Sequence, residues 1–252
     1  FIDHDAKDAQ QRYRAIGFCR RYRNIFLITS PDGIHWSDTG FRQPVLERAN
    51  EGPTNVVYDA KADRYLAYML VKRGAERRHI EYSESKNLEA KWSGMKTILE
   101  PNLEDDTFGR VQLNAIRAEY YNMSGFLYGN IYIGILSVLY VTEDIANPTL
   151  GQAGVDGPIE AQLVYSRDGV KWNFFEDRSP VIPRGEGDAF DSGMIIFTAK
   201  EPLVEENGIH WYYTGSTQTH GGLLKDKVMS IGRGSWRLDG FVSLDADADG
   251  GV

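Results

Sequence analysis

Three carboxylate side chains, Asp191, Glu119 and Glu51, each stand just ahead of a segment with the composition of a strand. Asp191 opens the largely apolar run 191–196, where a carboxylate contributes little to packing. Two carboxyl groups at one cavity suffice to cleave a glycosidic bond, because one donates a proton to the leaving group while the other acts as nucleophile or base. These three residues are our catalytic candidates. The alternative for each is a cap that accepts hydrogen bonds from backbone N–H groups at the start of a strand.

Polar and aromatic residues near these carboxylates are candidates for binding a sugar. The segment 213–222 is polar and small in composition, which suits recognition of sugar hydroxyl groups and equally suits an ordinary connecting loop. Four aromatic side chains could stack on a sugar ring or belong to the core: Tyr120, Tyr121, Trp211 and Tyr212. The substrate-binding candidates are Asn55, Tyr121, Glu186, Ser192 and His220.

Other acidic residues fit structural roles. Aspartate is a good turn former, because its side chain accepts hydrogen bonds from nearby backbone groups. We assign turn roles to Asp32, Asp59, Asp63, Asp168 and Asp239. Asp105 and Asp106 lie just upstream of an expected strand, and we expect them in an acidic surface loop.

A seven-residue pattern around Asp-Gly predicts a repeated hairpin. In segment 166–172, Ser-Arg-Asp-Gly-Val-Lys-Trp follows an alternating apolar run, and segment 30–36 has the same shape. Segment 83–92 is a looser copy. Asp-Gly makes the bend, and the aromatic residue anchors the next strand.

Two stretches of the chain align with one offset of 56 residues, measured from Asp3 to Asp59 and from Trp36 to Trp92. A period of this length with four strands per period is typical of propeller blades. We therefore predict an all-β fold, a five-bladed β-propeller over residues 1–244. About four blades are recognisable, and the first is incomplete. An all-β sandwich is the alternative.

The third repeat is longer than the others and contains an insertion at 142–158. Its expected strands are 119–126, 130–141 and 159–166. Segment 131–141 is the longest apolar run, which is too short for a membrane helix and suits a buried strand. In the fourth repeat, Asn-Gly within 206–208 predicts another hairpin. Helical periodicity is weak everywhere, and we interpret the best candidate, 5–11, as a loop.

The formal net charge of −8 argues against a nucleic-acid partner, because binding to phosphates needs clustered basic side chains. Two basic runs are expected to be solvated. They contain Arg20, Arg21 and Arg23, and then Lys72, Arg73, Arg77 and Arg78. No membrane segment is expected. Cys19 is the only cysteine, so no disulfide forms within the chain.

The segment 245–250, Asp-Ala-Asp-Ala-Asp-Gly, matches the start of a calcium loop, with carboxylates at alternate positions and a glycine for the turn. No helical pattern flanks it. We interpret 245–252 as an acidic linker toward a following domain, with a structural calcium site as the alternative, and expect no other cofactor and no metal at the candidate site.

Several motifs together resemble a group of predicted glycosidases related to glycoside hydrolase families 32, 43 and 68. The motifs are the Ser-x-Asp-Gly-x-x-Trp turns and segments 180–186, 190–194, 212–221 and 239–244. The resemblance covers nearly the whole chain. It implies a five-bladed propeller, a carbohydrate substrate such as a fructan, arabinan or xylan, and a β-sandwich domain after the linker. It also supports a functional role for Asp191.

The chain departs from those families at their signature motifs. No segment resembles Asn-Asp-Pro-Asn-Gly, the Arg-Asp-Pro motif is missing, and Cys19 follows Phe18 rather than a glutamate. The first hypothesis is a glycoside hydrolase for an oligo- or polysaccharide. The second is a non-catalytic carbohydrate-binding propeller. The third is a sialidase-like enzyme, although the Asp-Gly turns are one residue shorter than its Asp boxes. A polysaccharide substrate would fit an exported protein.

Overall fold

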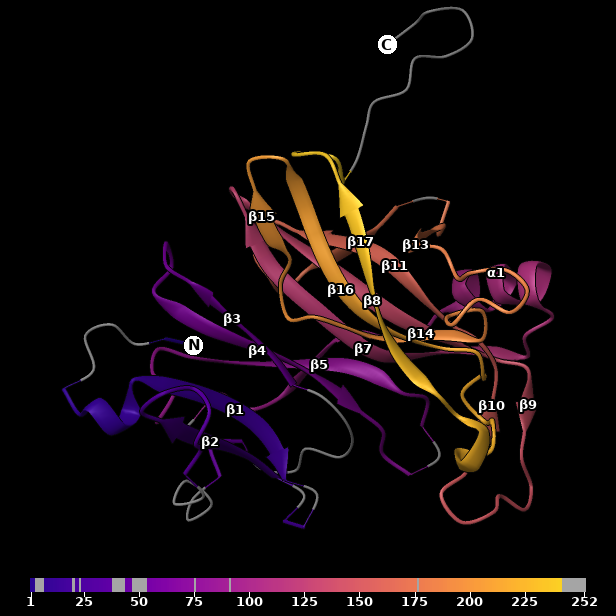
Figure 1. Ribbon diagram of the computed structural model, residues 1–252, viewed down its shortest axis with the longest axis horizontal. Coiled ribbons are helices and arrows are strands. Elements are labelled where there is room, and N and C mark those ends of the chain that lie inside the picture. Colours follow the sequence, from indigo (N-terminus) through magenta and orange to yellow (C-terminus); the bar gives the residue numbers. More distant parts are fainter. Residues whose placement is uncertain are drawn as a thin grey trace, which may run out of the picture.

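Antiparallel strands are the main secondary structure in the computed structural model, as the all-β prediction requires (Figure 1). The structure describes residues 1–2, 7–19, 21–22, 24–37, 44–46, 54–74, 76–90, 92–175 and 177–241. Glu51, Asp3 and the acidic segment 245–252 lie outside these residues, so the calcium alternative and the linker stay predictions.

The first sheet is a hairpin of β1 (Tyr13–Cys19) and β2 (Asn24–Ser30), preceded by the 3₁₀ turn η1 (Ala9–Gln11). It lies at one side of the molecule (Figure 1). The predicted turn follows it: Asp32 Oδ1 accepts hydrogen bonds from the N–H groups of Ile34 and His35, each at 2.8 Å. The aspartate is therefore a turn residue, as predicted.

The second sheet has four strands that follow one another in the sequence and in space. They are β3 (Thr54–Asp59), β4 (Arg64–Val71), β5 (His79–Ser85) and β6 (Lys96–Leu99). Each pairs antiparallel with the next. This is the arrangement expected of one propeller blade.

The third group of strands repeats this order. It contains β7 (Arg117–Tyr128), β8 (Ile131–Val141) and β11 (Ile159–Ser166), and its outer edge carries β12 (Trp172–Phe174) and β13 (Pro180–Ile182). The insertion forms a small hairpin of β9 (Glu143–Asp144) and β10 (Val155–Asp156). β8 is almost entirely buried, as its apolar composition predicts.

The fourth group contains β14 (Met194–Thr198), β15 (Leu203–Glu205), β16 (Gly208–Ser216) and β17 (Met229–Trp236), with the turn η3 (Leu224–Asp226) before β17. The hairpin predicted at 206–208 joins β15 to β16. A single parallel pair, Ile159 with Met194, links this group to the third in one nine-stranded sheet.

The turn at 166–172 packs the second sheet against the third. Asp168 Oδ1 accepts from the two N–H groups that follow the turn glycine, at 2.8 and 2.7 Å. Trp172 packs edge-on against Tyr68, with ring centroids 5.4 Å apart, and the Tyr68 hydroxyl donates to the Gly169 carbonyl at 2.8 Å. A Cβ at Gly134 would lie 2.9 Å from the Trp172 ring. The repeated motif therefore fixes both a turn and an interface between sheets.

The expectation of an acidic surface loop at 105–106 was wrong. These residues lie in the helix α1 (Leu103–Leu113), which is capped by Asn102. Asp105 is fully buried and accepts hydrogen bonds from the Tyr120 hydroxyl at 2.8 Å and from Arg178 Nη1 at 2.9 Å. The helix buries Asp105 and Gly109 rather than an apolar stripe, so its sequence carries little helical periodicity.

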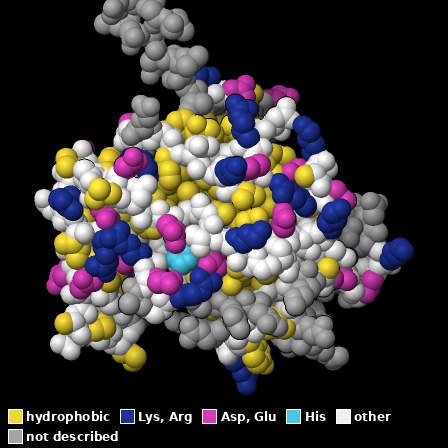
Figure 2. Space-filling model, turned by 180° about the vertical axis from the view of Figure 1, so that it is seen from behind, with side chains coloured by type: hydrophobic (Ala, Val, Ile, Leu, Met, Phe, Trp, Pro, Cys, Tyr) yellow, Lys and Arg dark blue, Asp and Glu magenta, His cyan; other side chains and the backbone are white. Residues whose placement is uncertain are grey.

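The surface mixes charges of both signs. On the face seen from behind, basic and acidic side chains lie next to one another around a strip of hydrophobic side chains (Figure 2). Within the described ranges, no helix has the length and apolar character needed to span a bilayer.

Candidate functional site

Glu119 lies near the start of β7 and is only 2% exposed. Its two oxygens each accept a hydrogen bond from a guanidinium group: Oε2 from Arg78 Nη1 at 2.6 Å, and Oε1 from Arg117 Nε at 3.0 Å. Arg117 also holds Asp144 of the β9–β10 hairpin, at 2.9 and 2.6 Å. The carboxylate is therefore held between two basic side chains.

The charges around Glu119 determine its ionisation. Burial alone would raise the pKa of this carboxyl, but Arg78 and Arg117 outweigh burial and hold it below its ordinary value. Glu119 is thus an anion at neutral pH, with both oxygens engaged.

Arg78 was expected to be solvated, and this expectation was wrong. Its side chain is only 11% exposed, because it reaches inward from just before β5 to Glu119. Its neighbour Arg77 makes a more exposed ion pair with Asp106, at 2.9 Å. Two arginines that are adjacent in the sequence therefore differ in burial.

Tyr121 and His220 meet at the same place. The Arg78 guanidinium lies 5.4 Å from the centroid of the Tyr121 ring, and the His220 ring lies 4.9 Å from it, nearly perpendicular. The register of β7 shifts between Tyr120 and Asn122, which leaves Tyr121 as a bulge residue. Bulges redirect a side chain out of the regular pleat and are common beside functional sites. The structure therefore brings the predicted residues Glu119, Tyr121 and His220 together around Arg78.

His220 is buried and oriented by its backbone surroundings. Its Nδ1 lies 3.0 Å from the Val155 carbonyl oxygen, which can only accept, so Nδ1 carries the proton and Nε2 has the lone pair. Burial lowers the pKa of His220, and the charges of Arg78 and Lys227 lower it further. The imidazole is therefore neutral at neutral pH.

The loop that carries His220 fits closely onto the β10 segment. The N–H of His220 donates to the Gly157 carbonyl at 3.0 Å, and the N–H of Gly221 donates to Asp156 Oδ1 at 2.7 Å. A Cβ at Gly221 would lie 2.5 Å from Asp156 Cβ, so this close approach requires glycine. Of the segment 213–222 that was expected to be a loop, residues 213–216 belong to β16 and residues 217–222 form this fixed loop.

Asp191 lies in the turn directly before β14 and is 6% exposed. Its Oδ2 accepts a hydrogen bond from the Tyr213 hydroxyl at 2.7 Å. A Cβ at Gly185 or at Gly215 would come within 2.4 Å of the Asp191 side chain. Burial, followed by the bond to Asp191, raises the pKa of Tyr213 to about 12, so the hydroxyl stays a donor.

Ser192 and Glu186 lie beside Asp191 but differ in their contacts. The Ser192 carbonyl accepts from Arg184 Nη1 at 2.6 Å, and Arg184 Nε donates to Glu160 at 3.2 Å. The Glu186 side chain is exposed. Arg184 thus braces the turn that presents Asp191.

Asn55 joins three segments of the chain. Its Nδ2 donates to the Lys200 carbonyl at 3.2 Å, and its Oδ1 accepts from the Gly125 N–H at 3.0 Å. Ser124 adds a bond to the Thr198 carbonyl at 3.1 Å. The first strands of the second sheet, the third group and the fourth group, which are β3, β7 and β14, therefore lie side by side. Backbone groups occupy the Asn55 amide.

The Asp191 turn and the Glu119 cluster flank one loop. The Gly193 N–H donates to the Ser216 carbonyl at 2.9 Å, and a Cβ at Gly193 would lie 2.4 Å from the backbone of Gln218. His220 follows two residues later in this loop. Among the described residues, no group of three or more His, Cys, Asp and Glu side chains could hold a metal ion.

Sequence reasoning missed Arg78, Arg117 and Tyr213, the partners that fix the predicted carboxylates. A basic run and a strand tyrosine gave no local sign of these roles. Tyr213 lies in the predicted polar segment 213–222, which was the only available signal.

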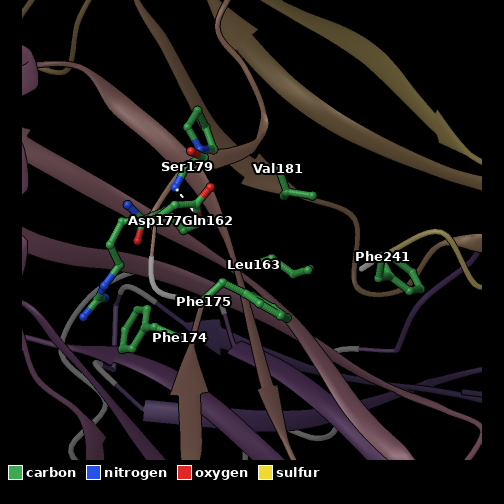
Figure 3. A pocket seen from close by; sticks show the side chains of 10 residues that line it. Gln162, Leu163, Phe174, Phe175, Asp177, Ser179, Val181 and Phe241 are labelled. Carbon is green, nitrogen blue, oxygen red and sulfur yellow. Dashed lines mark hydrogen bonds between the residues drawn. The ribbon is translucent and has the colours of Figure 1, made fainter. Parts of the chain in front are cut away.

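A pocket of about 250 Å³ lies elsewhere, at the outer edge of β11 (Figure 3). None of the predicted site residues lines it.

No protein-family model matches the sequence, and no curated protein matches it. Solved glycoside hydrolases are similar in structure. One is a protein of the GH130 family of mannoside phosphorylases, a family that contains glycoside hydrolases targeting β-1,2-mannosidic linkages in Candida mannan. It has a TM-score of 0.53 and 16% identity over 86% of this chain and 58% of that chain.

Two further structures give similar values. A thermostable family-43 glycoside hydrolase has a TM-score of 0.53 and 12% identity, over 83% of this chain and 62% of that one. The GH32 β-fructofuranosidase of Bombyx mori has a TM-score of 0.50 and 11% identity, over 85% of this chain and 42% of that one. This chain therefore spans 42% to 62% of the length of these three structures. They share a five-bladed β-propeller-like fold, which confirms the resemblance drawn from the sequence.

Proposed function

We propose that this chain is the propeller part of a glycoside hydrolase that acts on an oligo- or polysaccharide. The observation that carries the proposal is the meeting of Glu119, Tyr121 and His220 around the buried Arg78. The likeness in fold to glycoside hydrolases of several families supports it. The four groups of strands would be four blades of a five-bladed ring, with the first incomplete.

The two carboxylates differ in their surroundings, as glycosidic cleavage requires. Glu119 is held as an anion by Arg78 and Arg117, which suits the ionised partner. Asp191, whose Oδ2 accepts a hydrogen bond from the Tyr213 hydroxyl, would be the second catalytic carboxylate. Glu51 is the third candidate and lies outside the described residues.

The residues around Glu119 suit a sugar ligand. Nε2 of the neutral His220 can accept a hydrogen bond from a hydroxyl group, and the Tyr121 ring offers an apolar face. Ser192 and Glu186 would contribute polar groups beside Asp191. Asn55 would act indirectly, by joining the start of β3 to the second half of β7.

One observation favours a second candidate function, a non-catalytic carbohydrate-binding propeller. Both Glu119 oxygens accept hydrogen bonds from arginine side chains, so reaction at this carboxylate would require one of these bonds to open. A binding protein would have no such requirement.

The test is release of reducing ends from mannan, arabinan, xylan and fructan by the wild type and by Asp191→Asn and Glu119→Gln variants. Asp63→Asn is the matched control, because Asp63 has φ 49° in a turn where asparagine is also tolerated. We expect release by the wild type and the control and its loss in both site variants, with unchanged circular dichroism. Polysaccharide binding without release by any protein would instead support the binding module.

A further inference from the structure

The 250 Å³ pocket opens where the outer strand of the third group is interrupted. β12 pairs with residues 164–166 of β11, and β13 pairs with Ala161 and Gln162. Neither register includes Leu163, so the β11 edge is uncovered there. Residues 177–179, which precede β13, line the hollow at this gap (Figure 3).

The lining is apolar on one side and polar on the other. Leu163, Phe175, Val181 and Phe241 come from different parts of the chain and surround the same space in Figure 3. Asp177 and Ser179 lie together at the opposite side, where the Ser179 N–H donates to Asp177 Oδ1 at 3.2 Å. Such a pocket fits a small molecule with one apolar face and polar groups along its edge.

The polar wall is fixed in place by the helix. Arg178 has φ 54°, an uncommon conformation for a residue with a side chain, and it is 8% exposed. Its guanidinium bonds to Asp105 at 2.9 Å and to Glu104 at 3.3 Å, and lies 3.6 Å from the centroid of the Phe174 ring. These contacts hold the strained backbone, so the pocket is formed before any ligand arrives.

Gln162 forms a fixed part of the pocket wall. It is 1% exposed, and its Nε2 donates to the Tyr140 hydroxyl at 2.6 Å. Its Oε1 is itself buried, so this oxygen does not face a ligand in the pocket.

We propose that this pocket binds a single neutral sugar ring and is a second carbohydrate site, separate from the Glu119 cluster. Its volume lies just below the lower limit of about 300 Å³ for drug-sized ligands, which suits one ring. A sugar ring has an apolar face for Phe175 and Phe241 and hydroxyl groups for Asp177 and Ser179.

The two sites lie on different strands. The pocket is on the outer edge of β11, whereas Glu119 is in β7, with β8 between them. Two strand spacings of about 4.8 Å separate β7 from β11. A second site held rigidly to the first would raise the effective concentration of a polysaccharide that reaches both. The inference does not require hydrolysis.

The test uses isothermal titration and protein NMR with four probes: the methyl β-glycosides of mannopyranose, glucopyranose and xylopyranose, and methyl α-L-arabinofuranoside. Variants Phe175→Ala and Asp177→Ala remove the apolar and the polar wall. Tyr212→Ala is the matched control, because Tyr212 is an aromatic residue, 42% exposed, outside the pocket.

We expect at least one probe to shift the amide signals of Leu163, Ser179 and Val181. Phe175→Ala should weaken binding about tenfold or more, and Asp177→Ala severalfold, whereas the control changes it by less than about twofold. Asp177→Ala keeps the test open should Phe175→Ala fail to fold.

Asp191→Asn should bind the probe at this pocket as the wild type does, whether or not the wild type hydrolyses polysaccharide. The inference is overturned if no probe shifts these signals, or if neither pocket variant weakens the binding. Loss of release in Asp191→Asn with pocket binding intact would separate this site from the proposed catalytic one.

Discussion

Replacing Arg78 by Met should destabilise the protein strongly, because it removes one of the two cations that hold the buried Glu119. The lost hydrogen bond, from Nη1 to Oε2 at 2.6 Å, involves two charged groups, for which about 1.5–3 kcal/mol is typical. Leaving a buried charge wholly unpaired costs about 3–5 kcal/mol. Because Arg117 still bonds to Oε1, we expect a loss of about 2–3 kcal/mol of unfolding free energy.

The loss should depend on pH. Glu119 has a lowered pKa in the native state, so its ionised form stabilises the fold above the unfolded-state value of about 4.3. That contribution disappears as pH falls through the lower native pKa. The difference between wild type and Arg78→Met should therefore be smaller at pH 3 than at pH 7.

The assay is urea unfolding, followed by tryptophan fluorescence at both pH values. The control is Arg77→Met, which removes an ion pair whose arginine side chain is 38% exposed and should cost less than about 1 kcal/mol. In the double variant with Glu119→Gln, part of the loss should be recovered, because no unpaired charge remains. Equal losses for the two arginine variants, or an equal Arg78→Met loss at pH 3 and pH 7, would refute the reasoning.

Three further predictions concern a turn, a helix and a histidine. Asp168→Ala should lower the unfolding free energy, measured by thermal unfolding, by about 1–2 kcal/mol, because two backbone N–H groups lose their acceptor. Asp168→Asn keeps the acceptor oxygen, so an equal loss in both variants would contradict this. Gly109→Ala should destabilise the protein by about 1–3 kcal/mol despite its helical position, because the new Cβ would lie 2.4 Å from the Tyr140 ring. A variant that is more stable than the wild type in urea unfolding would contradict this close packing. The lowered pKa of His220 means that its neutral form stabilises the fold above about pH 6.5 and that this stability is lost as pH falls toward the native value. His220→Phe should therefore show a smaller drop in unfolding free energy between pH 7 and pH 5, and an unchanged drop would contradict this.

Local chemistry explains what the sequence could predict. The hairpin at 166–172 depends on hydrogen bonds within the turn itself, from backbone N–H groups to the Asp168 and Ser166 side chains, so seven residues contain the whole signal. The Asn-Gly hairpin before β16 is similar. The strands of the apolar segments also followed from composition, since burial on both faces leaves long apolar runs.

Long-range partners explain what the sequence could not predict. Arg78 is buried because it pairs with a carboxylate on β7 that is 41 residues away in the sequence, and nothing near Arg78 in the sequence indicates this. The helix α1 was missed because a polar cap and the buried Asp105 stabilise it rather than an apolar stripe. Tyr121 and His220 were each predicted, but only the fold shows that they meet.

The Asn55 amide has a consequence for how fast the protein folds. Its two partners, Gly125 and Lys200, are 70 and 145 residues away in the sequence, so both bonds close very long loops. Contacts between residues so far apart in the sequence form late, and a fold rich in them folds slowly. Asn55→Ala should therefore accelerate unfolding while leaving the folding rate nearly unchanged, a φ-value close to zero in stopped-flow kinetics. The side chain that joins β3, β7 and the end of β14 would then govern the lifetime of the native state rather than the path to it.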